Sequence, residues 1–276
     1  MDEREKNVVG FLLVLPALTI LAVLYIYPLV KSMAVSFVTE EKVMTFDNYR
    51  KVFDLYLKDI LYTLFITAIT VGITFVISIA ISSYLRFKEW KFLDYMYRLP
   101  LFIPFLIVGH AMRIFLAPHG TLNSFLTRLL GIEELPGLSG SWVGLVITFV
   151  WVMTPFSTLI ILGAFRALDD SYIEAAINLG SSKWKVIRDI IIPLTRPSIM
   201  VALVLTFVRT ISSLTIPLMV GPNKPNMITV DMMFRVNYFR DWGVANALGV
   251  ISYIIVLGLA VYYLRFMMAE RGGLKA

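Results

Sequence analysis

The sequence predicts an all-α membrane protein with six transmembrane helices, and three observations lead to this fold class. Of the 276 residues, 58% are hydrophobic and 16% are charged, whereas a soluble domain has a charged fraction of roughly a quarter. Six apolar runs are long enough to cross a bilayer, and Lys and Arg are more frequent in every second connection between them. The predicted spans lie near residues 8–36, 60–85, 93–116, 142–165, 197–220 and 244–266, within one transmembrane domain over 1–276.

The first run follows a leader of mixed charge, and its apolar stretch extends from Val8 to Val30. A cleaved signal peptide has a basic leader and an apolar core of about 7–15 residues, so we expect a retained first span. The second run, ILYTLFITAITVGITFVISIAISSYL, contains scattered small and hydroxylated residues. Such residues suit close packing between membrane helices.

Prolines mark the later runs. The third run holds Pro100 and Pro104 and is the least regular of the six, although lone prolines are tolerated where neighbouring groups satisfy the freed backbone atoms. Pro155 in the fourth run and Pro217 in the fifth predict kinks. Kinks in membrane helices often flank a polar path.

The distribution of basic residues predicts the orientation. With the N-terminus inside, the inner segments hold 14 of the 25 Lys and Arg residues and the outer segments hold 8. Because cytoplasmic loops carry the excess of positive charge, we expect both termini in the cytoplasm. The first outer loop, with four basic residues, is a local exception. The net charge of +6 fits basic loops rather than nucleic-acid binding.

A polar, basic stretch, SYIEAAINLGSSKWKVIRDIIIPLTRPS, separates two apolar runs at residues 171–198. Ser171 with Glu174 matches a capping box, which predicts that a helix begins there. Gly180 is expected to end that helix, and one of the two serines after it to cap a second helix that runs to Pro193. The stretch therefore predicts two short cytoplasmic helices joined by a glycine turn.

Both short helices have an apolar face. On the first helix this face, at i, i+3, i+4 and i+7 spacing, consists of Tyr172, Ala175, Ala176 and Leu179. On the second helix it consists of Trp184, Ile187 and Ile191. Periodicity alone leaves two interpretations open: a connector that lies on the membrane surface, or a docking element for a partner.

The segment EAAINLGSSKWKVIRDIIIP resembles the EAA loop of permease subunits of type I ABC importers. That loop has Glu-Ala-Ala, three residues, Gly, nine residues and then Ile-x-Leu-Pro. The matching residues here are Glu174, Ala175, Ala176, Gly180, Ile190 and Pro193. The chain departs at Ile192, where Leu is usual. The resemblance extends from the second span to the C-terminus, and FDNYRKVF in the first outer loop adds to it.

The resemblance implies a coupling helix that seats in a groove of a separate ATP-binding subunit. The candidate coupling residues are Glu174, Ala175, Ala176, Gly180, Trp184, Ile190 and Pro193. It further implies two ATPase copies that hold ATP and Mg, a second permease or second copy of this chain, and an extracytoplasmic substrate-binding protein. The expected location is a prokaryotic cytoplasmic membrane, and closure of the ATPase pair would move the spans as rigid bodies.

The chain lacks the motifs of an enzyme. It contains no P-loop, no G-x-S-x-G and no H-E-x-x-H. It has no cysteine and two histidines, so we expect no catalytic residue, no metal site and no cofactor on this chain. An ATP-independent channel or carrier, or a membrane anchor, is an alternative that does not explain the helix–Gly–helix stretch.

Polar residues within the spans mark a candidate substrate path. Arg209 lies about halfway along the fifth run, and a charge there must face a wet cavity or pair with neighbouring groups. Thr210 and Ser213 add hydroxyls next to it, and His110 and Arg113 lie in the third run. Each has a plainer interpretation: structural pairing for Arg209 and His110, and extension toward the membrane surface for Arg113.

The substrate class is less sharply indicated. AAINLG and FVRTISSLTIPLMVG resemble polyamine, ferric-ion and oxyanion or phosphonate permeases, whereas sugar permeases more often show a DGA version of the loop. FLLVLPALTILAVLYIYPLVKSMAVSF resembles both groups, so a sugar is the second candidate. Arg209 favours an anion over a polyamine if it faces the path.

Overall fold

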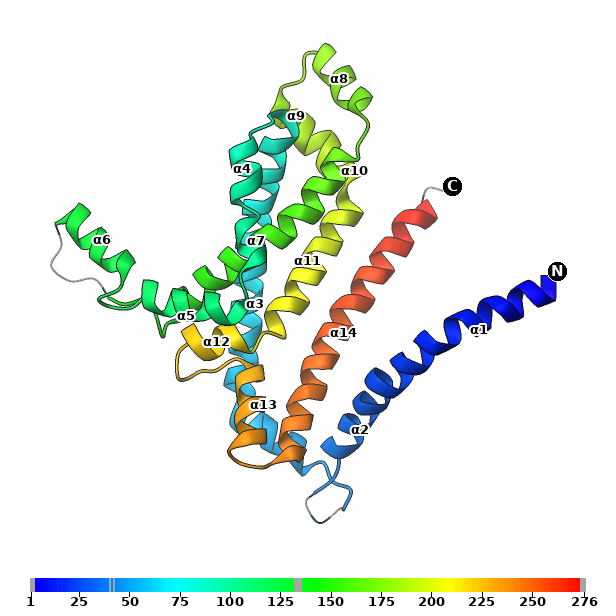
Figure 1. Cartoon of the computed structure of the whole chain (residues 1–276), viewed down its shortest axis with the longest axis vertical. Coiled ribbons are helices and arrows are strands. Elements are labelled where there is room, and N and C mark those ends of the chain that lie inside the picture. The colour runs from blue at the N-terminus through cyan, green and yellow to red at the C-terminus, as the bar shows by residue number, and fades with distance from the viewer. Residues whose placement is uncertain (1–2, 40, 42, 132–135, 274–276) are drawn as a thin grey trace. The chain divides into compact units, whose positions relative to one another are not determined.

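The computed structural model describes residues 3–39, 41, 43–131 and 136–273, which form helices joined by short connections (Figure 1). Within these ranges the β contacts amount to one isolated antiparallel bridge between Val38 and Met44. The predicted all-α class is confirmed. The helices form two compact units, Met1–Leu57 with Asp231–Tyr253 and Lys58–Val230 with Ile254–Ala276.

Four helical stretches among the described residues are long and apolar enough to cross a membrane, and the number rises to six if each of two bent pairs is one span. The four are Phe11–Ser36, Asp47–Phe87, Trp142–Arg166 and Trp242–Tyr263. The bent pairs are Lys91–Phe102 with Phe105–Phe115, and Lys183–Leu194 with Arg196–Ile211.

The predicted third span, 93–116, is not one straight helix. The helix α4 (Lys91–Met96) and the 3-10 helix η2 (Leu99–Phe102) lead to α5 (Phe105–Phe115) through a bend of 105°. The bend falls at Pro104. A proline disfavours the helical conformation of the residue before it, and Ile103 is accordingly extended, with φ −101° and ψ 123°.

The predicted fifth span, 197–220, is also divided. The helix α11 (Arg196–Ile211) ends before α12 (Thr215–Val220) begins. Pro217 has no N–H to donate to the Ser213 carbonyl one turn earlier. Instead, the Thr229 hydroxyl donates to that carbonyl at 2.7 Å, so the break is held by a contact from elsewhere in the chain.

The first unit contains α1 (Glu3–Leu21), the π-helix η1 (Ala22–Ile26) and α2 (Tyr27–Ser36), which follow one another without interruption. It also holds the start of α3 (Asp47–Phe87), most of α13 (Ile228–Asn237) and the first part of α14 (Trp242–Gly273). Within FDNYRKVF, the buried Asn48 donates to the carbonyls of Ser36 and Val38, both at 3.0 Å. The motif thus anchors the turn that leads into α3.

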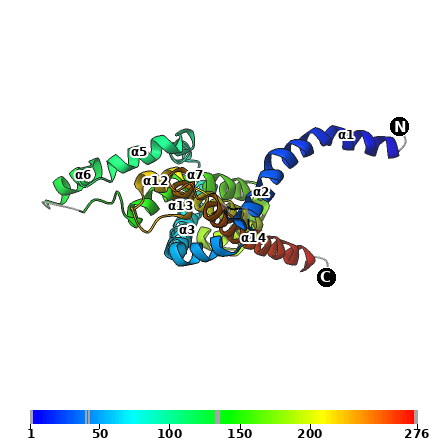
Figure 2. The same cartoon turned by 90° about the horizontal axis from the view of Figure 1, so that it is seen from below.

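The second unit packs around α7 (Trp142–Arg166), whose N-cap Ser141 accepts a hydrogen bond from the Gly144 N–H at 3.1 Å. Two-thirds of the residues in the most apolar stretch of α7 are buried. The helix α11 packs along it, whereas α6 (Thr121–Leu130) projects from the end of α5 in both views (Figures 1 and 2).

Hydroxyl side chains line the buried face of α3. Six of them, at helical spacing, are fully buried: Thr63, Thr67, Thr70, Thr74, Ser78 and Ser82. We use the name unpaired hydroxyls for five buried Thr side chains of the described residues that have no hydrogen-bond partner: Thr67, Thr70, Thr74, Thr158 and Thr206. Small and hydroxylated residues allow membrane helices to approach closely, as the second run predicts.

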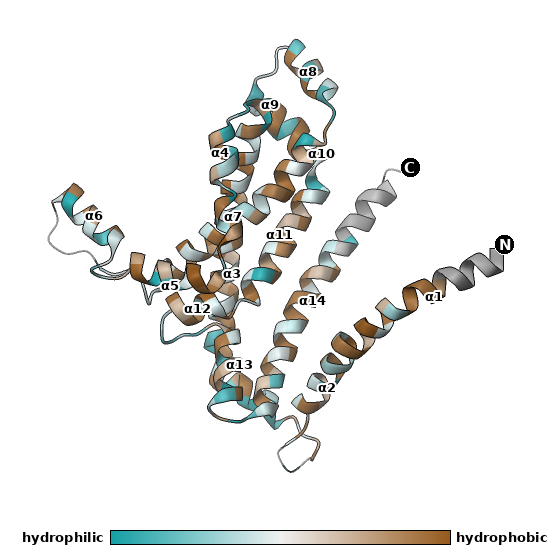
Figure 3. Ribbon diagram, viewed as in Figure 1, coloured by the Kyte–Doolittle hydropathy of each residue, from teal (hydrophilic) through white to brown (hydrophobic). Residues whose placement is uncertain are grey.

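Beyond the end of α7 the chain forms α8 (Asp170–Asn178), α9 (Lys183–Val186), the π-helix η3 (Ile187–Ile191) and α10 (Ile192–Leu194). Hydrophilic and hydrophobic residues alternate on α8 and α9 (Figure 3). Their apolar residues join α7 and α11 in a cluster that we call the seat: Ile161, Phe165, Ile173, Ala176, Val186, Ile187, Ile191, Ile199 and Ala202.

Candidate functional site

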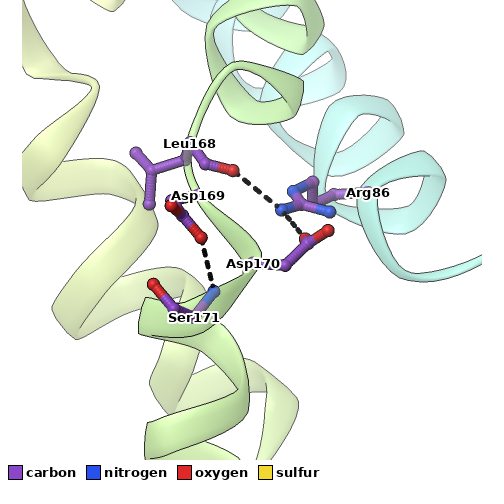
Figure 4. Close-up of polar contacts among 5 residues, drawn as sticks. All are labelled: Arg86, Leu168, Asp169, Asp170 and Ser171. Carbon is purple, nitrogen blue, oxygen red and sulfur yellow. Dashed lines mark hydrogen bonds and ion pairs between the residues drawn. The ribbon is translucent and has the colours of Figure 1, made fainter.

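The N-cap of α8 lies two residues before the one that the sequence predicts. Asp169, not Ser171, is the N-cap, and its carboxylate accepts a hydrogen bond from the Ser171 N–H at 2.9 Å (Figure 4). This donor lowers the pKa of the Asp169 carboxyl below its ordinary 3.8. The predicted Ser171–Glu174 capping box is therefore wrong, because a carboxylate placed at a helix N-terminus caps it directly.

The start of α8 is tied to the end of α3 by Arg86. Its guanidinium donates to the Leu168 carbonyl at 3.2 Å and forms an ion pair with the Asp170 carboxylate (Figure 4). The Arg86 side chain is 14% exposed, whereas that of Asp170 is 71% exposed. We call this pair of contacts the Arg86 clamp. The clamp links the C-terminal end of α3 to the residues at the start of α8.

Gly180 ends α8 as the sequence predicts. Its φ of +84° is in the left-handed region, where a glycine carries no Cβ penalty. The Ser181 N–H donates to the Ala176 carbonyl at 3.0 Å, and the Gly180 N–H donates to the Ile177 carbonyl at 2.8 Å. These two bonds are those of a Schellman motif. Ser182 then caps α9 by accepting from the Lys185 N–H at 3.4 Å.

The predicted apolar face of the first short helix is divided in the structure. Tyr172, Ala175 and Leu179 are exposed, and Leu179 reaches 88%. Ala176 lies in the seat at 8% exposure, so it packs against its own chain rather than on the open face. Glu174 is exposed beside that face. The structure therefore leaves a small apolar surface open on α8, formed by Tyr172, Ala175 and Leu179.

The second short helix is divided in the same way. Ile187 and Ile191 are buried in the seat and Ile190 packs against it, whereas Trp184 is 68% exposed. Pro193 has no N–H for the carbonyl of Asp189, and the residues before it form the π-helix η3 in place of a regular α-helix. The predicted helix to Pro193 thus exists, with a π segment inside it.

Arg209 lies in the last turn of α11, next to the break before α12. Its Cζ atom is 4.3 Å from the ring centroid of Phe156 and 5.7 Å from that of Phe105. Aromatic faces attract a guanidinium, so two rings hold this charge near the end of α11. The residue is exposed in the single chain, which leaves its donors open toward a solute or another subunit.

The other four predicted path residues, Thr210, Ser213, His110 and Arg113, differ in burial and in hydrogen bonding. The buried Thr210 hydroxyl donates to the Thr206 carbonyl at 2.8 Å, which satisfies it within the helix. The Ser213 hydroxyl is buried and has no partner among the described residues. His110 and Arg113 are exposed and line, with His119, an open depression of about 530 Å³. Arg209 is not among the residues that line this depression.

Sequence reasoning missed the Arg86 clamp and a second ionic contact, in which Asp94 pairs with Arg98 at 2.8 Å and approaches Arg166 at 3.8 Å. The signal for Asp94 with Arg98 was available, because opposite charges four residues apart on a helix are neighbours. For Arg86 with Asp170 no local pattern exists. The two residues are 84 positions apart.

The comparison with protein families identifies the chain's class. Residues 91–271 match the family described as "Binding-protein-dependent transport system inner membrane component". The chain is 26% identical over 283 residues to the trehalose/maltose transport system permease protein of Thermococcus litoralis, with 95% of this chain and 94% of the relative covered. It is 28% identical over 221 residues to the spermidine/putrescine permease protein of Escherichia coli, with 79% and 80% covered.

Solved structures show the same fold. A bacterial ABC transporter that imports the acidic polysaccharide alginate has a chain with a TM-score of 0.80 and 18% identity, which covers 97% of this chain and 96% of its own length. A chain of the MetNI methionine ABC transporter has a TM-score of 0.62 and 16% identity, and covers 79% and 97%. With two-thirds of its length matched, the chain belongs to the family of binding-protein-dependent transport system inner membrane components, as a permease of the type I ABC importer kind.

Proposed function

We propose that this chain is half of the translocation path of an ATP-driven importer, and that the open face of α8 docks on the ATPase subunit. The observation that carries the proposal is the combination at α8. An apolar surface of Tyr172, Ala175 and Leu179 is open on one side of the helix, and the seat and the Arg86 clamp hold the other side.

Such an element suits the transmission of force. A helix that a partner pushes moves the spans only if it is fixed to them, and packed interfaces shift as rigid bodies between discrete arrangements. Ile173 and Ala176 fix α8 to α7 and η3 through the seat. Glu174, exposed beside the docking face, would contact the partner rather than cap the helix.

Membership of the family supports the remaining partners of the proposal. Two copies of an ATPase would hold ATP and Mg, and a second permease or a second copy of this chain would complete the path. An extracytoplasmic binding protein would deliver the solute. The chain would cross a prokaryotic cytoplasmic membrane several times, with both termini and α8 in the cytoplasm, and would carry no catalytic residue, metal or cofactor itself.

The docking role is tested by substitutions on the open face alone. Leu179→Asp and Ala175→Trp should each detach the ATPase during co-purification while the permease still inserts, because one places a charge and the other a bulky ring in the contact. Lys185→Asp on α9 is the matched control and should leave the complex intact. Undiminished ATPase binding and uptake in both variants would contradict the role. Uptake without ATP would support a channel or carrier.

For the solute, we propose a molecule with an oxyanion group, because Arg209 is exposed and held by two aromatic rings near the end of α11. A sugar is the second candidate, favoured by the trehalose/maltose and sulfoquinovosyl glycerol relatives, which align with 95% of the chain. Polyamines and ferric ions, cargo of other relatives, would place a cation against Arg209, which charge repulsion disfavours.

The two candidates differ in a measurable way. In the reconstituted complex with its binding protein, molybdate, maltose and putrescine should be compared for stimulation of ATP hydrolysis. Arg209→Gln should reduce stimulation by an oxyanion by roughly ten- to hundredfold, since one charged hydrogen bond contributes about 1.5–3 kcal/mol, and Arg209→Lys should retain part of it. Stimulation by maltose alone, unaffected by Arg209→Gln, would assign the sugar.

A further inference from the structure

An apolar groove of about 620 Å³ lies in the second unit between the C-terminal part of α3 and α9. Its lining includes Val76 and Ala80 on α3 and Trp184 on α9. These side chains are exposed in the chain. Since α3 is one of the helices able to span the membrane, one end of the groove runs along a surface that faces hydrocarbon.

The other end of the groove is cationic. Lys88 and Lys183 both line it, with Lys88 Nζ 5.9 Å from the ring centroid of Tyr84 and Lys183 Nζ 5.5 Å from that of Phe87. No described residue of the lining is acidic. The two ammonium groups therefore create a positive potential at the mouth of an apolar channel.

A buried polar atom also lies in the lining. Ser83 is 7% exposed, and its hydroxyl has no hydrogen-bond partner among the described residues. A buried hydroxyl without a partner is costly and is normally satisfied. The Ser83 oxygen itself is covered, so this residue contributes to the wall of the groove and not to the binding of a head group.

Aromatic side chains place this mouth at the level of lipid head groups. Tyr84 packs on Trp90 with a centroid distance of 5.9 Å, and Trp90 on Phe92 at 6.0 Å. Of these rings that of Tyr84 lines the groove, and Trp184 lines it from α9. Trp and Tyr gather at the membrane–water interface, where an apolar body and a polar tip are both satisfied.

We propose that the groove binds an anionic phospholipid, with an acyl chain along α3 and the phosphate between Lys88 and Lys183. An apolar channel with a dicationic mouth matches an amphiphile that has one negative head and a long tail. A protein partner would need an acidic residue at the mouth and an apolar segment laid along α3, a helix that is able to span the membrane. The proposal rests on the membrane setting of the family and not on the docking role of α8.

Bound there, the lipid would contact both α3 and α9, close in sequence to Arg86 of the clamp. Such a ligand would stiffen the connection between the span and the α8–α9 turn, because binding to one arrangement stabilises it. Uptake would then depend on the content of anionic lipid in the membrane, at constant ATPase binding.

The test uses the full chain in nanodiscs doped with brominated phosphatidylglycerol or brominated phosphatidylcholine, alone and assembled with its ATPase. Bromine quenches nearby tryptophan, and the difference between the wild type and Trp184→Phe isolates the signal of Trp184. Phosphatidylglycerol should quench Trp184 at a mole fraction lower by on the order of tenfold, since each lysine near the surface favours anionic lipid.

Lys88→Gln with Lys183→Gln should abolish this preference, whereas Lys185→Gln, on the same helix but outside the groove, should retain it. Ala80→Trp should fill the channel and remove the saturable quenching of Trp184. Equal quenching by both lipids in the wild type would mean that the groove contacts lipid without a preference for the anionic head group, and would overturn the proposal. Loss of all quenching on assembly would assign the groove to a protein partner and overturn it as well. Neither result would alter the outcome of the Leu179→Asp experiment.

Discussion

The second unit contains two regions that treat their polar groups in opposite ways. Around the α8–α9 turn, Arg86 binds Asp170 and Leu168, Asp169 caps α8, and Ser182 caps α9. In the apolar helices, by contrast, the unpaired hydroxyls are fully or almost fully buried without a partner among the described residues. Both regions are packed, but side-chain bonds between elements hold the turn, whereas these five hydroxyls make no such bond.

The difference indicates how the two regions work. Directed bonds hold one geometry, so the turn can transmit a displacement without deforming. Small side chains that pack closely but bond only weakly allow helices to slide between alternative arrangements. We therefore expect the turn to be rigid and the hydroxyl-lined helices to be the place where the spans rearrange.

The strongest way to break the rigid region is to empty the seat. Phe165 is fully buried there, and Phe165→Ala should lower the free energy of unfolding by about 3–5 kcal/mol through lost contacts and a cavity. Leu159→Ala, on the same helix at an exposed position, should cost far less. Thermal unfolding of both variants in nanodiscs measures the effect. Equal losses would show that the seat is no tighter than a lipid-facing surface.

Substitution of Gly180, which ends α8, should give the next largest loss of stability. Gly180→Val should destabilise the turn by about 1–2 kcal/mol, because a side chain at φ +84° is strained. A Cβ at Gly180 would meet no heavy atom within 4 Å, so backbone strain is the whole effect. Gly180→Asn is the matched variant, since asparagine tolerates this conformation. Proteolysis of the loop compares the two, and equal sensitivity would contradict the role of the turn.

The Arg86 clamp tests whether directed bonds connect the turn to α3. Arg86→Ala should cost about 1–2 kcal/mol, since Asp170 is largely exposed and contributes less than the part-buried carbonyl of Leu168. ATP hydrolysis should continue while uptake falls several-fold. A double-mutant cycle with Asp170→Ala isolates the ion pair, which should account for less than about 1 kcal/mol. Unchanged uptake would remove the clamp from the transmission path.

Local chemistry made much of the fold predictable. The helical class, the glycine turn at Gly180 and a serine cap on α9 depend on neighbouring residues, and all three are confirmed. The prolines at 104 and 217 were visible, but whether a proline bends or breaks a membrane helix depends on which groups satisfy the freed carbonyl. At Pro217 that group is Thr229, twelve residues away.

At the site, too, local sequence patterns predict some features and miss those that depend on distant residues. Periodicity placed Tyr172, Ala175 and Leu179 on one side of α8 correctly, yet it included Ala176, because a face that is apolar by spacing does not reveal what covers it. The Arg86–Asp170 pair joins residues 84 positions apart, and only the folded chain brings them together.

A smaller effect should appear with pH at the start of α8. The folded-state pKa of Asp169 lies below 3.8 because the Ser171 N–H donates to its carboxylate. A lowered folded pKa means that the cap contributes above the unfolded value and that the contribution disappears as the pH falls through the folded pKa. The difference in stability between the wild type and Asp169→Ala should therefore be constant at neutral pH and shrink below pH 3.8. A constant difference down to pH 2 would exclude the cap.

The smallest expected effect compares the same substitution at two buried threonines, one whose hydroxyl is bonded and one whose hydroxyl is not. Thr195 and Thr206 are each buried, at 4% and 1% exposure. The Thr195 hydroxyl donates to the Ile191 carbonyl at 2.7 Å, whereas the Thr206 hydroxyl has no partner among the described residues. Thr195→Val should cost about 0.6–1 kcal/mol, the usual value of a hydrogen bond in a membrane protein. Thr206→Val should lie within about 0.5 kcal/mol of the wild type or stabilise it, since it removes a buried hydroxyl that bonds to nothing. Chemical unfolding of both variants in the same lipid measures the difference, and a larger loss at Thr206 would mean that its hydroxyl is bonded in the membrane and that the hydroxyl-lined helices are as fixed as the turn.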